Sequence, residues 1–305
     1  MRLRHVINAQ QFNRAGLEEM FKIAKKMESV VAKGGNRQLL GEIMATLFYE
    51  PSTRTRLSFE TAMLRLGGEV ISTENAREFS SHAKGETLED TIRIVNGYAD
   101  VIVLRHYEEG AAERAATVSD APILNAGDGP GQHPTQSLLD LYTIQKELGR
   151  IDGIKIAMVG DLAYGRTVRS LCYFLAKFED VKIYFVAPEV VKMRDDIKEY
   201  LTRHKTHFEE ETDLKKVTAE VDVLYQTRIQ KERFSDQKDY ERACGVYVID
   251  REIMKVLPKY SVVMHPLPRV GEILPEVDED SRAAYFRQAN NGLFIRMALL
   301  SMVLS

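Results

Sequence analysis

The sequence predicts an α/β protein with two doubly wound domains, each with a central parallel sheet, and a C-terminal helix that packs back on the first domain. Short apolar runs alternate with stretches of helical periodicity over residues 1–149, and the same alternation restarts after Gly153. Polar residues also collect directly after the apolar runs, where parallel sheets bind their ligands.

The composition indicates a globular protein that binds small anions. The chain has 305 residues, is 44% hydrophobic and carries a formal net charge of −3, which argues against nonspecific nucleic-acid binding. No apolar stretch approaches the roughly 18 residues of a membrane span, and residues 1–5 lack the apolar core of a signal peptide. We therefore expect no membrane partner and a cytoplasmic location.

Cysteine usage gives no sign of a disulfide scaffold or of a metal site. Cys172 and Cys244 are the only two cysteines and lie far apart in the sequence. The sequence therefore predicts neither a metal nor a cofactor.

The first half of the chain predicts four strands and three helices. Thr87 followed by Asp90 is a helix-capping pattern, and Gly149 can end the last of these helices. The predicted strands are 43–49, 69–72, 101–104 and 123–125, and the predicted helices are 52–66, 87–99 and 135–148.

The second half repeats this alternation. The predicted strands are 155–159, 181–186, 221–225 and 261–264, and a helix is predicted at 166–178. The tail from about Ser281 to Leu304 has a helical pattern. The expected domains are residues 1–149 and 150–285, and residues 286–305 form the helix that returns to the first domain.

The junction at Ser52 predicts a phosphate site. The segment Ser52-Thr53-Arg54-Thr55-Arg56 follows an apolar strand and opens a helix, so Ser52 lies where an N-cap belongs. A helix N-terminus favours anions, and the hydroxyls and arginines add donors for phosphate oxygens. The alternative is a capped surface helix whose arginines face water, but capping alone does not need this many donors.

Further polar groups follow other strands of the first half. Arg105 and His106 follow 101–104, and the turn-rich segment 127–136 contains His133 and Gln136. Arg105 could pair with a phosphate or carbonyl oxygen, and His133 could donate to an oxygen that becomes negative. Taken singly, these residues could also be a surface arginine and a turn histidine.

The second half places its polar groups in the same way. Arg166 and Thr167 follow one strand and 227–230 follows another, so two arginines could bind two carboxylates. The turn 160–165 lacks G-x-G-x-x-G and a Walker lysine, and its glycines suit a turn. The proline-rich segment 265–269 must be a rigid loop whose carbonyls could face an amino group. Lys84 lies in a polar loop that the pattern alone does not assign to a site.

Taken in order, these motifs resemble the aspartate carbamoyltransferase family over essentially the full length. The matching blocks are 48–60, 84–90, 105–106, 125–141, 160–167, 227–233 and 265–269. The resemblance implies transfer of a carbamoyl group from carbamoyl phosphate to the amine of L-aspartate, which gives N-carbamoyl-L-aspartate and phosphate in pyrimidine synthesis.

The resemblance also implies roles for individual residues. Ser52, Thr53, Arg54, Thr55 and Arg105 would hold the phosphate; Thr55, Arg105 and His133 would polarise the carbamoyl oxygen; Gln136 and the carbonyls near Pro266 and Leu267 would hold the carbamoyl amino group; Arg166, Thr167, Arg228, Gln230 and Lys84 would bind aspartate.

The loop with Ser80 and Lys84 would reach into a neighbouring subunit's site, which implies a homotrimer with shared active sites. Ser80 is preferred to Ser81 because it stands four residues before Lys84, as in the family pattern. Gly271 departs from that pattern, since an acidic residue is common there in relatives. Whether a regulatory chain joins the trimer stays open.

The implied chemistry needs no covalent enzyme intermediate. The amine attacks the carbamoyl carbon, a tetrahedral oxyanion forms, and phosphate leaves with a proton. Three other functions fit the sequence less well. A transcarbamoylase acting on ornithine usually shows His-Cys-Leu-Pro where this chain has His265-Pro266-Leu267-Pro268. A noncatalytic scaffold conflicts with the intact set of charged residues, and a nucleotide-dependent dehydrogenase conflicts with the absent glycine motif.

Overall fold

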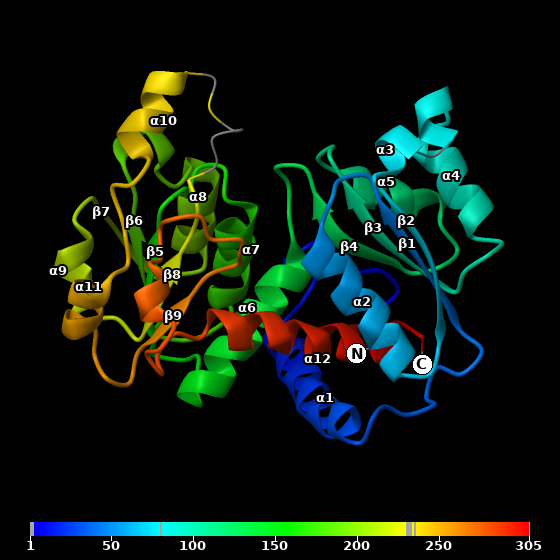
Figure 1. Ribbon diagram of the computed structural model, residues 1–305, viewed down its shortest axis with the longest axis horizontal. Helices are drawn as coiled ribbons and strands as arrows, with labels where there is room; N and C mark the ends of the chain where they lie inside the picture. The colour runs from blue at the N-terminus through cyan, green and yellow to red at the C-terminus, as the bar shows by residue number, and fades with distance from the viewer. Residues whose placement is uncertain (1–2, 80, 230–233, 235, 305) are drawn as a thin grey trace. The chain divides into compact units, whose positions relative to one another are not determined.

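The computed structural model describes residues 3–79, 81–229, 234 and 236–304 (Figure 1). The chain divides into two compact units, each of which is treated separately below. The first unit runs to Leu138 and takes in Asn290–Ser305, and the second is Leu139–Ala289. The division falls inside helix α6 (Pro134–Leu148), whereas the sequence placed the boundary after that helix.

The first unit contains a four-stranded parallel sheet in the order β2-β1-β3-β4. Its strands are β1 (Ile43–Phe48), β2 (Glu69–Glu74), β3 (Val101–His106) and β4 (Ile123–Asp128). Its helices are α1 (Arg14–Ala32), α2 (Thr53–Arg65), α3 (Ala76–Phe79), the 3-10 turn η1 (Ser81–Lys84), α4 (Leu88–Val95), α5 (Ala111–Val118) and the first turn of α6.

The second unit contains a five-stranded parallel sheet in the order β7-β6-β5-β8-β9. Its strands are β5 (Lys155–Val159), β6 (Lys182–Val186), β7 (His207–Glu211), β8 (Val223–Gln226) and β9 (Val262–Met264). Its helical elements are α7 (Arg166–Leu175), η2 (Glu189–Val191), α8 (Asp195–Arg203), α9 (Leu214–Thr218), α10 (Gln237–Ala243), α11 (Arg251–Val256), η4 (Pro275–Val277) and the start of α12 (Tyr285–Val303). Two parallel sheets with helical connections confirm the predicted α/β class.

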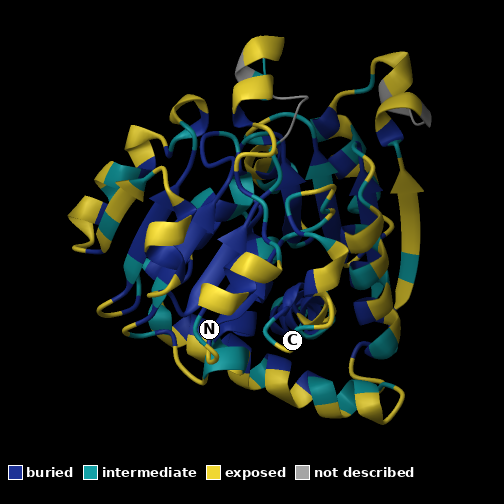
Figure 2. Ribbon diagram, turned by 60° about the vertical axis from the view of Figure 1, so that its left-hand side comes forward, coloured by how far each residue is buried: buried dark blue, intermediate teal, exposed yellow. Residues whose placement is uncertain are grey.

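Central strands are buried and edge strands are exposed. The strands β3, β5 and β6 are almost entirely buried, which explains their continuous apolar sequences. By contrast, β2 is exposed along most of its length and is drawn largely in yellow in Figure 2. This edge strand presents unpaired backbone groups and Ile71, whose side chain is 43% exposed.

The C-terminal helix α12 starts in the second unit and ends in the first. Within the first unit, the guanidinium of Arg296 lies 5.1 Å from the ring centroid of Phe59 on α2. Arg296 is buried, so the cation and the aromatic face meet away from water, where such a contact is strongest. The second part of α12 is therefore built into the core of the first unit.

Sequence patterns missed several peripheral elements. No helix was predicted at α1 or α5, and β7 reads His-Phe-Glu-Glu-Glu without an apolar run. An edge strand buries little surface, so its sequence carries no burial signal. The predicted helix cap at Thr87 is confirmed: Thr87 is the N-cap of α4, and its side chain accepts a hydrogen bond from the Asp90 amide.

Candidate active site

Each sheet has one point at which the strand order reverses. In the first sheet it lies between β1 and β3, and in the second between β5 and β8. Loops that leave these strands diverge to opposite faces, so their carboxyl ends leave a crevice in which open parallel sheets bind ligands. Four of the polar segments predicted from sequence follow these strands, whereas 127–136 follows β4 and 265–269 follows β9, each a neighbour in the same sheet. Topology thus brings them together within each unit.

In the first unit, the turn from Ser52 to Thr55 forms the start of helix α2. Ser52 is the N-cap of α2, but its side chain makes no capping hydrogen bond. The side chain of Thr55 is buried, whereas Thr53 and Arg54 are exposed. The first amides of a helix lack intrahelical acceptors and carry the positive end of its dipole. The turn can therefore donate several hydrogen bonds to a phosphate.

Arg54 and Arg56 have different surroundings, which the sequence could not distinguish. Arg56 lies 2.7 Å from a carboxylate oxygen of Glu74 and donates a 3.2 Å hydrogen bond to the Ser72 hydroxyl. Within the described part of the chain, the Arg54 guanidinium has no hydrogen bond or ion pair. Surrounding protein atoms lower the pKa of Arg54 by desolvation. Arg56 is thus a structural residue, and Arg54 is available to a ligand.

Arg105, at the end of β3, is held by an acidic neighbour. Its Nη2 atom lies 3.4 Å from Oε2 of Glu50, and its Nη1 atom donates a 3.2 Å hydrogen bond to the carbonyl of Ala126. The Arg105 side chain is only 13% exposed, so the partly buried cation is compensated by this carboxylate. Glu50 directly precedes the phosphate turn, and sequence analysis did not include it in the site.

The loop before α6 positions His133 and Gln136. Both oxygens of Asp128 accept backbone hydrogen bonds, from the amides of Gln132 at 2.8 Å and Gly110 at 3.0 Å. His133 follows this braced turn and is buried, and its carbonyl accepts the amide of Gln136 at 3.1 Å. The loop therefore fixes the backbone of a buried histidine immediately before the helix.

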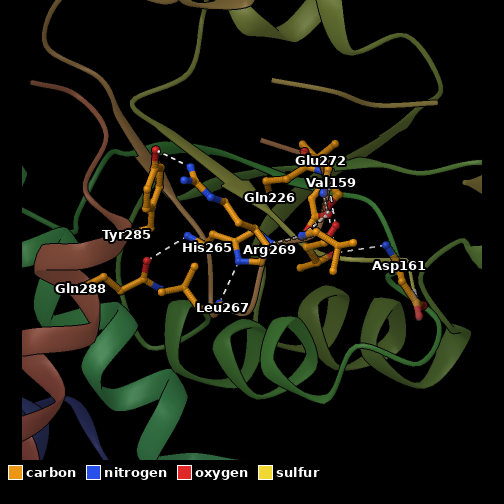
Figure 3. A network of polar contacts seen from close by, with 12 residues as sticks. Val159, Asp161, Gln226, His265, Leu267, Arg269, Glu272, Tyr285 and Gln288 are labelled. Carbon is orange, nitrogen blue, oxygen red and sulfur yellow. Dashed lines mark hydrogen bonds and ion pairs between the residues drawn. The ribbon is translucent and has the colours of Figure 1, made fainter. Parts of the chain in front are cut away.

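In the second unit, Thr227 fastens the ends of β5 and β8 together. Its hydroxyl donates a 2.9 Å hydrogen bond to the Val159 carbonyl and accepts a 3.0 Å hydrogen bond from the Asp161 amide (Figure 3). Gly160 has a φ of +110°, and a Cβ there would lie 2.5 Å from the Thr227 carbonyl oxygen. Only glycine fits this approach, which is a structural role as expected. The next residue, Arg228, is half-buried.

The other predicted aspartate ligands start helix α7 or lie beyond β8. Arg166 is the first residue of α7 and Thr167 the second, and both are half-buried. Arg166 and Arg228 thus follow the two strands at the switch point of the second sheet. Gln230 lies outside the described residues, so its predicted role stays a prediction.

The segment 265–269 follows β9 and forms a tight turn. His265 is buried, and Pro266 and Leu267 are half-buried. A hydrogen bond of 2.8 Å joins His265 Nε2 to Glu272 Oε1, as Figure 3 shows. Glu272 is not among the site residues predicted from sequence, because its pairing with His265 depends on how the loop folds.

The predicted neighbouring-subunit loop is described in part. Ser80 lies outside the described residues. Lys84 ends η1 with an exposed side chain, for which the described residues provide no hydrogen bond or ion pair. The described residues also contain no group of three or more histidines, cysteines or acids that could hold a metal ion. Among them, no helix is long and apolar enough to cross a membrane.

Comparison with known proteins identifies the family. Residues 4–146 match the aspartate/ornithine carbamoyltransferase carbamoyl-P binding domain, and residues 152–303 match the Asp/Orn binding domain of the same family. The chain is 63% identical to a chloroplastic aspartate carbamoyltransferase of Oryza sativa over 311 residues, covering 100% of this chain and 86% of the relative. It is 53% identical to the aspartate carbamoyltransferase catalytic subunit of Methanocaldococcus jannaschii, covering 98% of this chain and 97% of the relative.

A solved structure agrees with this similarity. Aspartate transcarbamoylase from Trypanosoma cruzi, in complex with carbamoyl phosphate and aspartate, superposes with a TM-score of 0.95 at 43% identity. The alignment covers 99% of this chain and 97% of that structure. Fold and sequence therefore agree over nearly the full length, and the chain belongs to the aspartate carbamoyltransferase family.

Proposed function

We propose that this protein is an aspartate carbamoyltransferase, which transfers the carbamoyl group of carbamoyl phosphate to the amine of L-aspartate in pyrimidine synthesis. The observation that carries the proposal is the Ser52–Thr55 turn. There the Ser52 hydroxyl makes no capping hydrogen bond, and the adjacent Arg54 guanidinium has no partner among the described residues. The T. cruzi relative, solved both with carbamoyl phosphate and aspartate and with carbamoyl aspartate and phosphate, supports the same substrates here.

The first unit would bind carbamoyl phosphate. Ser52, Thr53, Arg54 and Thr55 would hold the phosphate together with Arg105. For this, Arg105 would exchange Glu50, now 3.4 Å away, for phosphate oxygens. His133 with Thr55 and Arg105 would donate to the carbamoyl oxygen.

The second unit would bind aspartate. Arg166 and Arg228 would pair with its two carboxylates, assisted by Thr167, Gln230 and Lys84. Both arginines follow strands at one switch point, which supports binding of one dicarboxylate by both. The carbonyls of Pro266 and Leu267, together with Gln136, would hold the carbamoyl amino group.

The reaction would proceed by direct attack. The neutral amine of aspartate forms a bond to the carbamoyl carbon, and the carbonyl electrons move to oxygen. When the tetrahedral intermediate collapses, the carbon–oxygen bond to phosphate breaks, and phosphate leaves with the proton from the amine. Donors aimed at the oxyanion would supply much of the catalysis, since one such donor is typically worth about 3–4 kcal/mol.

We also propose a homotrimer in which Ser80 and Lys84 serve a neighbouring subunit's site. The exposed edge strand β2 and the exposed side chains of Leu57, Leu64 and Ile71 support an interface on the first unit. The M. jannaschii relative is named a catalytic subunit, which is consistent with assembly. Participation of a regulatory chain stays open. A cytoplasmic location stays a prediction, and plant relatives are named chloroplastic.

An assay of the purified protein tests the proposed function. Carbamoyl phosphate would be supplied with aspartate or with ornithine, and carbamoylated product and phosphate would both be measured. We expect product with aspartate and none above background with ornithine. Turnover of ornithine instead would assign the chain to the other branch of the family, and no turnover with either would favour a noncatalytic scaffold.

A further inference from the structure

The turn after β9 presents two backbone carbonyls that accept no hydrogen bond from the part of the chain that the structure describes. Pro266 and Leu267 are half-buried. Within the described residues, neither carbonyl oxygen accepts a hydrogen bond. Backbone carbonyls of partly buried residues are usually paired, so two unpaired acceptors on successive residues suit a ligand with an N–H₂ group.

His265 fixes the backbone of this turn through one defined tautomer. Its Nδ1 atom accepts a 2.8 Å hydrogen bond from the Leu267 amide, so Nδ1 carries no proton. The ring proton of the neutral imidazole is then on Nε2, which donates to Glu272 at 2.8 Å. The histidine ring thereby links Glu272 to the amide of Leu267, beside the two carbonyls.

Glu272 is itself held by the loop that follows the turn. Its Oε1 atom accepts from His265, and its Oε2 atom accepts from the amides of Val270 and Gly271, both at 3.1 Å. Burial alone would raise the pKa of Glu272, but these hydrogen bonds lower it to about 2. A carboxylate can accept on both oxygens at once, whereas a carboxamide of the same shape cannot.

Two other features show that the turn is constrained. Leu267 has a φ of +52°, a left-handed conformation that side chains with a Cβ rarely adopt, so contacts around it must maintain it. The His265 amide also donates a 2.9 Å hydrogen bond to the side chain of Gln288 on α12. The turn is thus anchored at its start by Gln288 and through the His265 ring by Glu272.

We propose that His265 and Glu272 are positioning residues that aim the Pro266 and Leu267 carbonyls at the amino group of the carbamoyl donor. The inference rests on the proposed function, which supplies that donor. Neither side chain needs to touch the substrate. Their effect is to select a donor with an N–H₂ group next to its carbonyl carbon.

Two pairs of variants separate the contacts. His265→Asn keeps an acceptor near the Nδ1 position but has no donor that reaches Glu272, whereas His265→Gln keeps a donor near the Nε2 position and lacks the short link to the Leu267 amide. Glu272→Gln has only one acceptor oxygen, so it loses the hydrogen bonds on one of the two carboxylate oxygens. Glu279→Gln is the matched control, because Glu279 is exposed and forms no hydrogen bond to the described residues.

The readouts are kcat, the KM of carbamoyl phosphate, and inhibition by inorganic phosphate and by succinate, which both lack the carbamoyl amino group. We expect Glu272→Gln and His265→Gln to raise the KM of carbamoyl phosphate or lower kcat by about tenfold to a hundredfold. Both inhibition constants should stay within about twofold of wild type. His265→Asn should retain more activity than His265→Gln, and Glu279→Gln should match wild type.

The outcomes distinguish this inference from the proposed function. If wild type forms no carbamoyl aspartate, the proposed function fails and the inference with it. If wild type is active and the variants keep its constants, His265 and Glu272 do not position the carbonyls. If kcat, both inhibition constants and the unfolding temperature all change together, the two residues stabilise the unit as a whole, and the positioning role is overturned.

Discussion

The hydroxyl of Tyr225 donates a 2.7 Å hydrogen bond to Oδ2 of Asp140, and both side chains are buried. The other oxygen of Asp140 accepts a 2.7 Å hydrogen bond from Gln288 Nε2, and Gln288 Oε1 accepts the amide of His265. A buried chain of hydrogen bonds thus runs from β8 to the turn that carries the Pro266 and Leu267 carbonyls. It lies entirely within the second unit.

Tyr225→Phe should destabilise the protein. Burial raises the pKa of Tyr225, so the hydroxyl stays protonated and donates to Asp140 throughout the working pH range. Its removal leaves a buried carboxylate with one donor fewer, which should lower the free energy of unfolding by about 1.5–3 kcal/mol in urea titrations. Tyr260→Phe is the control, because Tyr260 is 64% exposed. Equal losses in both variants would contradict this role of the hydrogen bond.

Arg54→Ala should mainly reduce activity, whereas Arg56→Ala should mainly reduce stability. Arg54 has no hydrogen bond or ion pair within the described residues, so its removal should leave the unfolding temperature unchanged and lower kcat/KM about a hundredfold to a thousandfold. Arg56 is paired with Glu74, so its removal should cost about 1 kcal/mol of stability with a smaller kinetic effect. Steady-state kinetics measures the activity of both variants, and thermal unfolding measures their stability. Near-normal turnover by Arg54→Ala would remove it from the phosphate site.

Arg228→Ala should mainly change the aspartate dependence. A charge-assisted hydrogen bond to a carboxylate is worth about 1.5–3 kcal/mol, so the KM of aspartate should rise about tenfold to a hundredfold. The KM of carbamoyl phosphate should change much less. Arg251→Ala, which removes an exposed arginine near Glu276, is the control. An unaltered aspartate saturation curve would exclude Arg228 as a substrate ligand.

Mixing inactive chains tests whether sites are shared. If Arg54 and Lys84 of one site come from different subunits, trimers refolded from equal amounts of Arg54→Ala and Lys84→Ala chains should recover activity in about one quarter of their sites. Each variant refolded alone should stay inactive. Absence of recovery in trimers shown to be mixed would place both residues in a site of one chain.

Stability should depend on pH through Glu272. Its pKa falls from the usual 4.5 to about 2 in the folded protein. Burial raises this pKa, but the hydrogen bonds from His265 and the backbone outweigh that effect. The folded state therefore gains about 3 kcal/mol above pH 4.5, and this gain is lost as pH falls toward 2. Urea unfolding at pH 5.5 and pH 2.5 should show less pH dependence in Glu272→Gln than in wild type. The same change in unfolding free energy between the two pH values in both proteins would show that Glu272 is not the source of the pH dependence.

Sequence patterns located the central strands of both sheets. The runs at 43–49, 101–104 and 155–159 became β1, β3 and β5, since a strand buried on both faces must be continuously apolar. The same reasoning missed β7, whose polar residues give a weak burial signal. It also missed α1, although the apolar residues of α1 recur at helical spacing. Local sequence thus predicts the interior of each sheet better than its periphery.

The sequence alone determined the α/β class, the candidate phosphate turn and the family resemblance, because these depend on local periodicity and on the order of motifs. Tertiary structure decided which arginine of the turn is committed, since Glu74 reaches Arg56 from β2 and no described residue pairs with Arg54. It also decided that Glu50 holds Arg105 and that Glu272 holds His265. Such pairings depend on where folding places each carboxylate, and no spacing in the sequence specifies that position.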